Sequence, residues 1–260
     1  MAASPFDTGR FSRLRAARGL SLGEPIAAVG STDSTNDDAL EAARAGAPHG
    51  ALFVADEQRA GRGRRGHRWT SPPGVNLTAS LLLRPTLPPE RLGALPLVVG
   101  LAVRALSARH VSSPLVVKWP NDVLAGSRKL AGVLVEARLD GAHIDALVVG
   151  VGLNLGMRDL PPEIAEIATS LALLGAAPLG REEALVELLA ELEPRLAAFE
   201  RGGLEPLLDE LRAHDGLLGA RVIVGDVSGV AAGIDADGAL LLEQPGGEIA
   251  RVTSGTVQLG

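Results

Sequence analysis

The sequence contains no cysteine and no tyrosine, and aromatic residues make up only 2% of its 260 residues. The absence of cysteine excludes disulfides, thiolate nucleophiles and cysteine-ligated zinc, and it fits a reducing compartment. With so few aromatic residues, a core must be built from alanine, valine, leucine and isoleucine. The two tryptophans, Trp69 and Trp119, are therefore informative, and both fall inside the motifs described below.

Long apolar runs are also missing. The first 20 residues lack the continuous apolar segment of a secretory signal, and no later run is long enough to span a bilayer. We therefore expect a cytoplasmic protein with no membrane partner. The formal net charge of -6 argues against broad binding to nucleic acid. A hydrophobic content of 46% over 260 residues predicts one main domain with a small appendage.

Apolar periodicity predicts alternating strands and helices over the first 215 residues. Ser34 and Asp37 have the spacing of a capping box, so a short helix is expected from Ser34 to Gly46. The sequence "DGAH" (140–143) is expected to join two strands as a hairpin. Pro194 is expected to kink or break a helical pattern over residues 181–212. Further strands are predicted at residues 51–58, 76–83, 115–120, 130–139 and 144–155, and a helical stretch at 88–110.

From residue 216 onward the pattern changes to short Val, Ile and Leu runs separated by glycine and aspartate. The sequence "DADG" (235–238) predicts a turn between two of these strands. Residues 216–260 are therefore predicted to form a small all-β module, near the lower size limit for independent folding. This module is expected to lean on a main domain of residues 1–215, of which residues 1–25 are an N-terminal extension.

Positive charge is concentrated in residues 55–74, despite the acidic balance of the chain. The arginines of this segment are Arg59, Arg62, Arg64, Arg65 and Arg68. Residues 61–66 satisfy the G-x-G-x-x-G dinucleotide pattern, but Pro72 and Pro73 forbid the helix that must follow it. Alternating glycine and arginine instead suit a mobile loop in which glycines permit positive φ and arginines bind a polyanion. A solvated basic loop, or one that touches nucleic-acid phosphates, is the alternative.

A second group of polar residues follows the predicted strand "LVVKWP" (115–120). It comprises Lys118, Asn121 and Asp122, with Lys129 and Gly132 a few residues later. Ligands of open α/β sheets bind at strand ends, so this group predicts a polar binding site. Taken singly, Trp119 is equally compatible with a core position, and Asp122 with a turn or cap.

A third motif, "GVGLNLG" (150–156), carries Gly150, Gly152 and Asn154. Glycine inside a strand indicates close approach of another group, and the Asn154 amide is able to read a base edge. A bulge beside a turn-forming asparagine explains the motif equally well. In "DSTN" (33–36), the hydroxyls of Ser34 and Thr35 either cap the following helix or bind a neutral polar group of a ligand.

Taken in order, "DSTN", "EQRAGRGRRGHRW", "KWPNDVL", "RKLAGVLVE" and "GVGLNLG" resemble the biotin protein ligases. The resemblance covers residues 29–156 and extends to the tail. It implies an α+β fold: a mixed-sheet catalytic domain of the biotin/lipoate ligase type with helices packed on the sheet, plus a small SH3-like β-barrel at the C-terminus. It also implies ATP and Mg²⁺ as cofactors and biotin as substrate. The implied reaction adenylates biotin, releases pyrophosphate and transfers the biotinyl group to a carrier lysine.

The resemblance also assigns roles to single residues. Lys129, Arg64 and Asp122 are implied to be catalytic, with Lys129 neutralising carboxylate or adenylate oxygens and Asp122 steering the incoming amine. Biotin contacts are implied for Ser34, Thr35, Asn36, Gln58, Gly61, Arg62, Gly63, Arg64, Lys129 and Gly132. ATP contacts are implied for Arg62, Arg64, Arg65, Trp69, Lys118, Asn121 and Asn154. The ligands of the metal ion are not identified.

The implied partner is the biotin carboxyl carrier domain of an acyl-CoA carboxylase. Relatives that double as repressors carry a winged helix-turn-helix, for which residues 1–32 are too short, so we expect no operator binding. A lipoate or octanoate ligase shares the acyl-adenylate chemistry and is the alternative within this class. A non-catalytic nucleic-acid binder is the alternative from another class. The sequence leaves both a monomer and a weak homodimer open.

Overall fold

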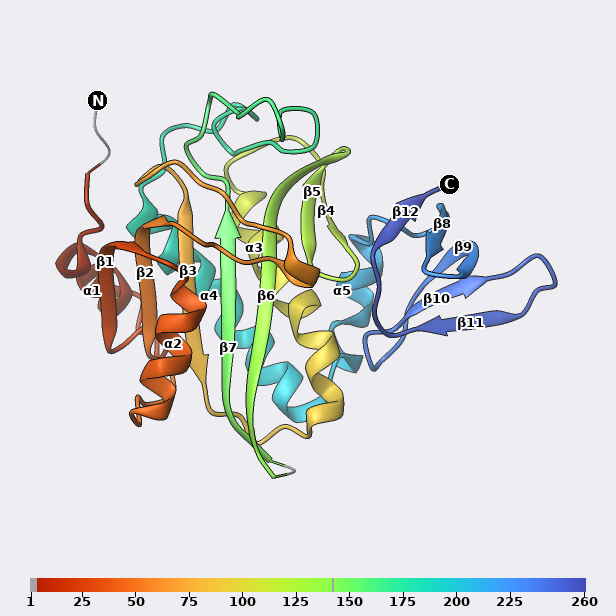
Figure 1. The fold of residues 1–260 in the computed structure, drawn as a ribbon, viewed down its shortest axis with the longest axis horizontal. Coiled ribbons are helices and arrows are strands. Elements are labelled where there is room, and N and C mark those ends of the chain that lie inside the picture. The colour runs from red at the N-terminus through yellow and green to blue at the C-terminus, as the bar shows by residue number, and fades with distance from the viewer. Residues whose placement is uncertain (1–3, 142) are drawn as a thin grey trace.

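The larger of two sheets has seven strands in the order β1-β2-β3-β7-β6-β5-β4 (Figure 1). The computed structural model describes residues 4–141 and 143–260. Strands β1 and β2 are parallel and the other neighbouring pairs are antiparallel, so the sheet is mixed. Its strands are β1 (Ile26–Thr32), β2 (Leu52–Gln58), β3 (Leu77–Leu83), β4 (Leu115–Lys118), β5 (Asp122–Ala125), β6 (Arg128–Asp140) and β7 (His143–Leu153).

Helices cover both faces of this sheet (Figure 1). Helix α2 packs on β2, β3 and β7 from one side, while α3 and α4 pack together on the other, with α1 against α4. The α-helices are α1 (Thr8–Ala17), α2 (Thr35–Arg44), α3 (Leu95–Ser107), α4 (Arg181–Gly202) and α5 (Leu208–Ala213). Short 3-10 segments are η1 (Arg64–Gly66), η2 (Pro89–Ala94) and η3 (Glu205–Leu207). None of the helices within the described residues is long and apolar enough to cross a bilayer.

The core is aliphatic, as the composition requires. Helix α3 is buried along most of its length because it is enclosed between the sheet and α4. Strand β3 is buried at every position, since helices lie on both of its faces. On the α2 side the buried helix positions include Ala39 and Ala43, whose small side chains let the helix backbone lie close to the sheet. This packing fixes the start of α2 over the middle of the sheet.

A second sheet of five antiparallel strands, in the order β11-β10-β9-β8-β12, follows α5 (Figure 1). Its strands are β8 (Arg221–Val224), β9 (Val227–Ile234), β10 (Leu240–Glu243), β11 (Ile249–Val252) and β12 (Val257–Leu259). The Val117 amide at the edge of the large sheet donates to the His214 carbonyl (2.8 Å). The indole Nε1 of Trp119, only 1% exposed, donates to the Gly238 carbonyl in the β9–β10 turn (2.9 Å). The Trp119 contact attaches the small sheet to the large one, and the Val117 contact attaches the end of α5, which precedes the small sheet, to the same edge.

The predicted mixed α+β class is confirmed, and the predicted strands are present. Two local expectations need correction. Of the kink or break expected at Pro194, the break is absent, because helix α4 continues through Pro194 to Gly202. Ser34 occupies the N-cap position of α2, but its side chain makes no capping hydrogen bond, since the Asp37 amide donates to the Ser34 carbonyl (3.0 Å) and the Asp37 carboxylate accepts from Arg62. In the predicted "DGAH" hairpin, β6 and β7 pair as expected, and position 142 lies outside the described residues. Helix α1 was not predicted.

The Trp119 contact gives a stability prediction. Replacing Trp119 with Phe should destabilise the fold by about 1–3 kcal/mol, because it leaves the Gly238 carbonyl without its donor. Trp69→Phe is the matched control, since the Trp69 Nε1 is buried without a partner and its removal breaks no hydrogen bond. Urea unfolding measures both. Equal stability of the two variants would contradict this account of the contact.

Candidate active site

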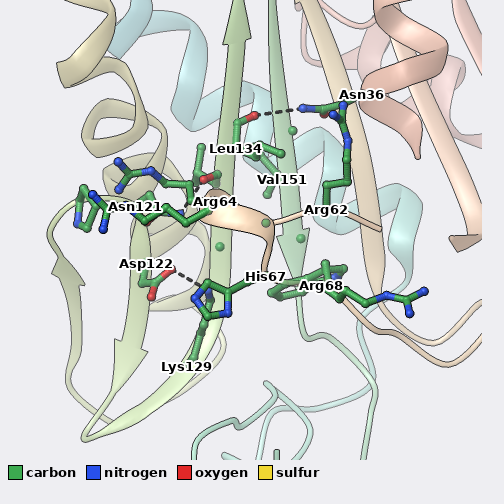
Figure 2. A pocket seen from close by; sticks show the side chains of 18 of the residues that line it. Asn36, Arg62, Arg64, His67, Arg68, Asn121, Asp122, Lys129, Leu134 and Val151 are labelled. Atoms are coloured by element: carbon green, nitrogen blue, oxygen red, sulfur yellow. Dashed lines mark hydrogen bonds and ion pairs between the residues drawn. The ribbon is translucent and has the colours of Figure 1, made fainter. Parts of the chain in front are cut away.

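A cavity of about 280 Å³ opens where β4, β5, β6 and β7 meet the start of α2 and the arginine loop, residues 59–69 (Figure 2). In Figure 2, Arg64 and Asn121 lie on one side of it, and Asn36 and Arg62 on the other. The small sheet contributes Gly255, Thr256 and Val257 to the lining. The predicted residues that line the cavity are Ser34, Thr35, Asn36, Gln58, Arg62, Gly63, Arg64, Arg65, Trp69, Lys118, Asn121, Asp122, Lys129 and Gly132.

The lining is strongly cationic. Its basic residues are Arg62, Arg64, Arg65, Arg68, Lys118 and Lys129, against one described carboxylate, Asp122. Partial burial lowers the pKa of the Arg64 guanidinium, and the charge of Arg65 lowers it further, while Asp122 opposes the change. An arginine stays protonated under these conditions, so Arg64 is an incompletely solvated cation. The cavity therefore favours a ligand with several negative charges.

Asp122 and Lys129 form the ion pair in the cavity, with Asp122 Oδ1 2.7 Å from Lys129 Nζ (Figure 2). The two residues come together because β5 and β6 pair directly after a short turn. Lys129 Nζ also lies 5.8 Å from the centroid of the Trp69 ring, within cation–π range. Its side chain is 36% exposed, so the ammonium is accessible from the cavity. An incoming carboxylate can therefore compete with Asp122 for Lys129.

The start of α2 forms a neutral polar wall. The Thr35 amide donates to Gln58 Oε1 (2.9 Å), and the Thr35 hydroxyl lies 3.1 Å from the same oxygen. This leaves the amino end of Gln58 free to donate to a ligand carbonyl. The Ser80 hydroxyl lies 2.6 Å from Asn36 Oδ1 and 2.7 Å from the Thr35 hydroxyl, so β3 supports this wall from behind. Ser34, Thr35 and Asn36 are each at most 4% exposed.

The two strand glycines of β7 make room for side chains of the protein itself. A Cβ at Gly150 would overlap the Asn36 carboxamide, and a Cβ at Gly152 would fall within the Trp69 indole. A Cβ at Gly132 on β6 would lie 3.5 Å from the Trp69 ring, so this glycine also packs against the indole. Close backbone approach, expected from "GVGLNLG", is therefore present. Its immediate partners are Asn36 and Trp69.

The arginine loop is a closed turn. Trp69 N donates to Gly61 O (2.9 Å) and Gly63 N to His67 O (2.7 Å). Positive φ occurs at Arg65 (54°) and Gly66 (78°), while Gly61 and Gly63, where glycine permits it, do not adopt it. Gly61 is needed for a different reason, because a Cβ there would collide with the Trp69 carbonyl.

Two predicted residues do not line the cavity. Gly61 lies in an adjoining hollow on the other side of the loop. Asn154 is 3% exposed, and its Nδ2 donates to the Thr169 carbonyl (2.9 Å) while its Oδ1 accepts from Asn76. Its amide is thus already used within the protein. Sequence reasoning missed Ser80 and Glu136, because single polar residues in alternating strands carry no motif.

Comparison with known proteins now identifies the family. Residues 29–154 match the Biotin/lipoate A/B protein ligase family, and residues 218–260 match the Biotin protein ligase C terminal domain. The chain is 38% identical to the biotin (acetyl-CoA-carboxylase) ligase of Mycobacterium tuberculosis, over 88% of this chain and 86% of that protein. It is 36% identical to the bifunctional ligase/repressor BirA of Escherichia coli, over 86% of this chain and 71% of that protein.

The solved structures agree. The biotin protein ligase from Aquifex aeolicus in complex with biotin and ATP superposes with a TM-score of 0.78 at 30% identity, over 91% of this chain and 100% of that one. The superposed residues make up 91% of this chain and so include both sheets. The similarity is therefore not confined to one small domain. The chain belongs to the biotin protein ligase family.

The packing of Trp69 on Gly152 can be tested by fluorescence. Gly152→Ala should displace the indole toward water and shift the emission of Trp69 to the red, because the new methyl group occupies the ring position. The Trp69 spectrum is obtained by subtracting the emission of the matching Trp69→Phe protein. Gly30→Ala, where a Cβ meets nothing within 4 Å, is the control and should leave the spectrum unchanged. An unshifted spectrum in Gly152→Ala would refute the packing.

Proposed function

We propose that this chain is an ATP-dependent biotin protein ligase that forms biotinyl-5'-AMP and transfers the biotinyl group to a lysine of a biotin carrier domain. The observation that carries this proposal is the division of one cavity into a neutral polar wall at α2 and a cationic region around Arg64 and Lys129. The first suits the uncharged ureido ring of biotin, and the second suits a carboxylate meeting a triphosphate. Membership of the biotin protein ligase family indicates that the two ligands are biotin and ATP.

The first step requires two anions to approach. A biotin carboxylate oxygen attacks the α-phosphorus of ATP, the bond to the bridging oxygen breaks, and pyrophosphate leaves with the electron pair. Arg64 and Lys129 lower the barrier by neutralising the oxygens that gain charge in the transition state. Lys129 is already held near the reacting position by Asp122 at 2.7 Å. Arg64, Arg65, Lys118 and Asn121 are proposed to hold the phosphates.

The second step is aminolysis of the mixed anhydride. The neutral amine of the carrier lysine attacks the acyl carbon, the bond to the AMP oxygen breaks, AMP leaves with the electron pair, and the proton lost by the nitrogen passes to water. Asp122 is the carboxylate of the cavity lining, so we assign it the orientation of the incoming amine. Trp69 presents its indole between Gly152 and Lys129, where it is proposed to contact adenine. Asn154 is proposed to support the Lys129 segment rather than to contact the base, since its Nδ2 lies 3.5 Å from Lys129 O.

The cavity also fits a Mg²⁺ ion that arrives on ATP. Mg²⁺ commonly binds through one or two carboxylates together with phosphate oxygens and water. Asp122 is the carboxylate that would hold it, and the bound ion would offset phosphate charge. Among the described residues no group of three or more His, Asp or Glu side chains is placed to form an all-protein cage.

We assign residues 1–215 to the catalytic domain and residues 216–260 to the small domain. The family match at residues 218–260 and the start of β8 at Arg221 support this boundary. The partner is proposed to be the carrier domain of an acyl-CoA carboxylase, because relatives are named for that substrate. A lipoate ligase is less well supported, since residues 218–260 match a domain named for biotin ligases.

The proposal is tested by ATP–pyrophosphate exchange with Mg²⁺ and biotin, lipoate, octanoate or no acid. We expect exchange with biotin alone, followed by labelling of one lysine when a carrier domain is added. Exchange with lipoate or octanoate instead would keep the adenylating chemistry and overturn the substrate. Absence of exchange with all acids would overturn the function.

Removing either central cation should slow adenylation. We expect Lys129→Ala and Arg64→Ala each to reduce the biotin-dependent exchange rate about 100-fold or more, because each removes preorganised positive charge from the reacting oxygens. Arg128→Ala is the matched control, since this neighbouring arginine is exposed and outside the cavity lining. Circular dichroism checks that the fold is intact. A wild-type rate in either cavity variant would remove that residue from the mechanism.

A further inference from the structure

Glu136 lies in the middle of β6, beside the arginine loop and outside the cavity lining. Its Oε2 accepts from Arg62 Nη2 and from Asn36 Nδ2, both at 2.7 Å. The side chain is 25% exposed, so both bonds are partly shielded from water. One carboxylate oxygen therefore joins the arginine loop to the polar wall at α2.

The hydrogen bonds of Asn36 fix the orientation of its side-chain amide and extend the contact from Glu136 to Ser80. Because the Asn36 amino group donates to Glu136, its Oδ1 faces the Ser80 hydroxyl at 2.6 Å. Ser80 in turn contacts the Thr35 hydroxyl, and the Thr35 amide donates to Gln58 Oε1. A continuous series of polar contacts thus runs from the Arg62 guanidinium to Gln58.

The same contacts remove Arg62 from the free cations of the cavity. Its Nη2 also pairs with Asp37 Oδ1 at 2.6 Å, so two carboxylates compensate one guanidinium. The Asp37 side chain is 52% exposed, twice as much as that of Glu136. Exposed ion pairs contribute little, whereas charge-assisted bonds that are partly buried contribute more. Glu136 is therefore the stronger of the two anchors.

We propose that Glu136 is a positioning residue: it holds Arg62, and with it the arginine loop, against the polar wall where biotin binds. This inference rests on the proposed function for its effect on biotin, but its effect on the loop is independent of any substrate. In this proposal Arg62 anchors the loop to Glu136, and Arg64, Arg65 and Lys118 bind the phosphates.

The kinetic test is a double-mutant cycle in the exchange assay. Glu136→Gln should raise the KM for biotin about tenfold and change the KM for ATP by less than about twofold, because the wall contacts biotin. Arg62→Met should do the same. The double variant should have a KM for biotin no higher than that of either single variant, because both substitutions break the same Arg62–Glu136 bond. Asp37→Asn should change the KM for biotin by less than about twofold.

A second measurement needs no ligand. Trypsin should cleave the apo protein after Arg62, Arg64 or Arg65 about fivefold faster in Glu136→Gln than in the wild type, because the loop opens more often. Asp145→Asn is the control: its carboxylate is similarly exposed and pairs with Arg84 and Arg138 at the other end of β7. It should leave loop cleavage unchanged, as mapped by mass spectrometry.

The outcomes separate the two hypotheses. Faster loop cleavage in Glu136→Gln without biotin-dependent exchange in the wild type would support the anchor and refute the proposed function. Unchanged cleavage in Glu136→Gln, or multiplicative effects of Glu136→Gln and Arg62→Met on the KM for biotin, would overturn the positioning role.

Discussion

Repulsion between like charges is the constraint on which the rest of this structure depends. The cavity gathers several cations within one chain segment and its surroundings, and each must be tolerated before any anionic ligand arrives. Arg59 is compensated by Asp33, Arg62 by Asp37 and Glu136, and Lys129 by Asp122. Arg64 makes no ion pair with any described residue, and its pKa is lowered by burial. Arg65, Arg68 and Lys118 of the lining likewise make no ion pair with a described residue, so the cations without a partner gather around the cavity.

The sheet supplies the geometry that this charge arrangement needs. The β6–β7 pair runs through the centre of the large sheet, where Gly132 lies opposite Gly152, Leu134 opposite Gly150 and Glu136 opposite Val148. Gly150 and Gly152 are two residues apart on β7 and so share one face of the sheet, where they admit Asn36 and Trp69. Helix packing on β3 then fixes the height of Asn36 above the strands. The neutral wall and the cationic region therefore share one rigid base, while the loop that spans them is held by a few polar bonds.

Much of the site could be predicted from the sequence because its residues come in short motifs with the right chemistry. "DSTN", the arginine run and "KWPND" each place several polar groups within a few positions, and the fold brings those motifs to one cavity. The links between motifs could not be predicted in this way. Asn36 and Glu136 are 100 residues apart, and Trp119 and Gly238 are 119 apart, so neither pair leaves a local pattern. Positive φ at Arg65 was unexpected for the same reason: the three-dimensional path of the loop decides it.

Trp119 belongs at once to the cavity wall and to the joint with the small sheet. Its neighbours Lys118 and Asn121 line the cavity, while its indole nitrogen donates to the β9–β10 turn. Gly255 and Thr256, just before β12, line the same cavity. A ligand that contacts both the cavity wall and residues 255–256 would link occupancy of the cavity to the seating of the small sheet. By reciprocity, a ligand that tightens the joint is itself bound more tightly by a chain whose joint is already closed. A surface substitution in the β9–β10 turn can thus alter substrate affinity without touching substrate.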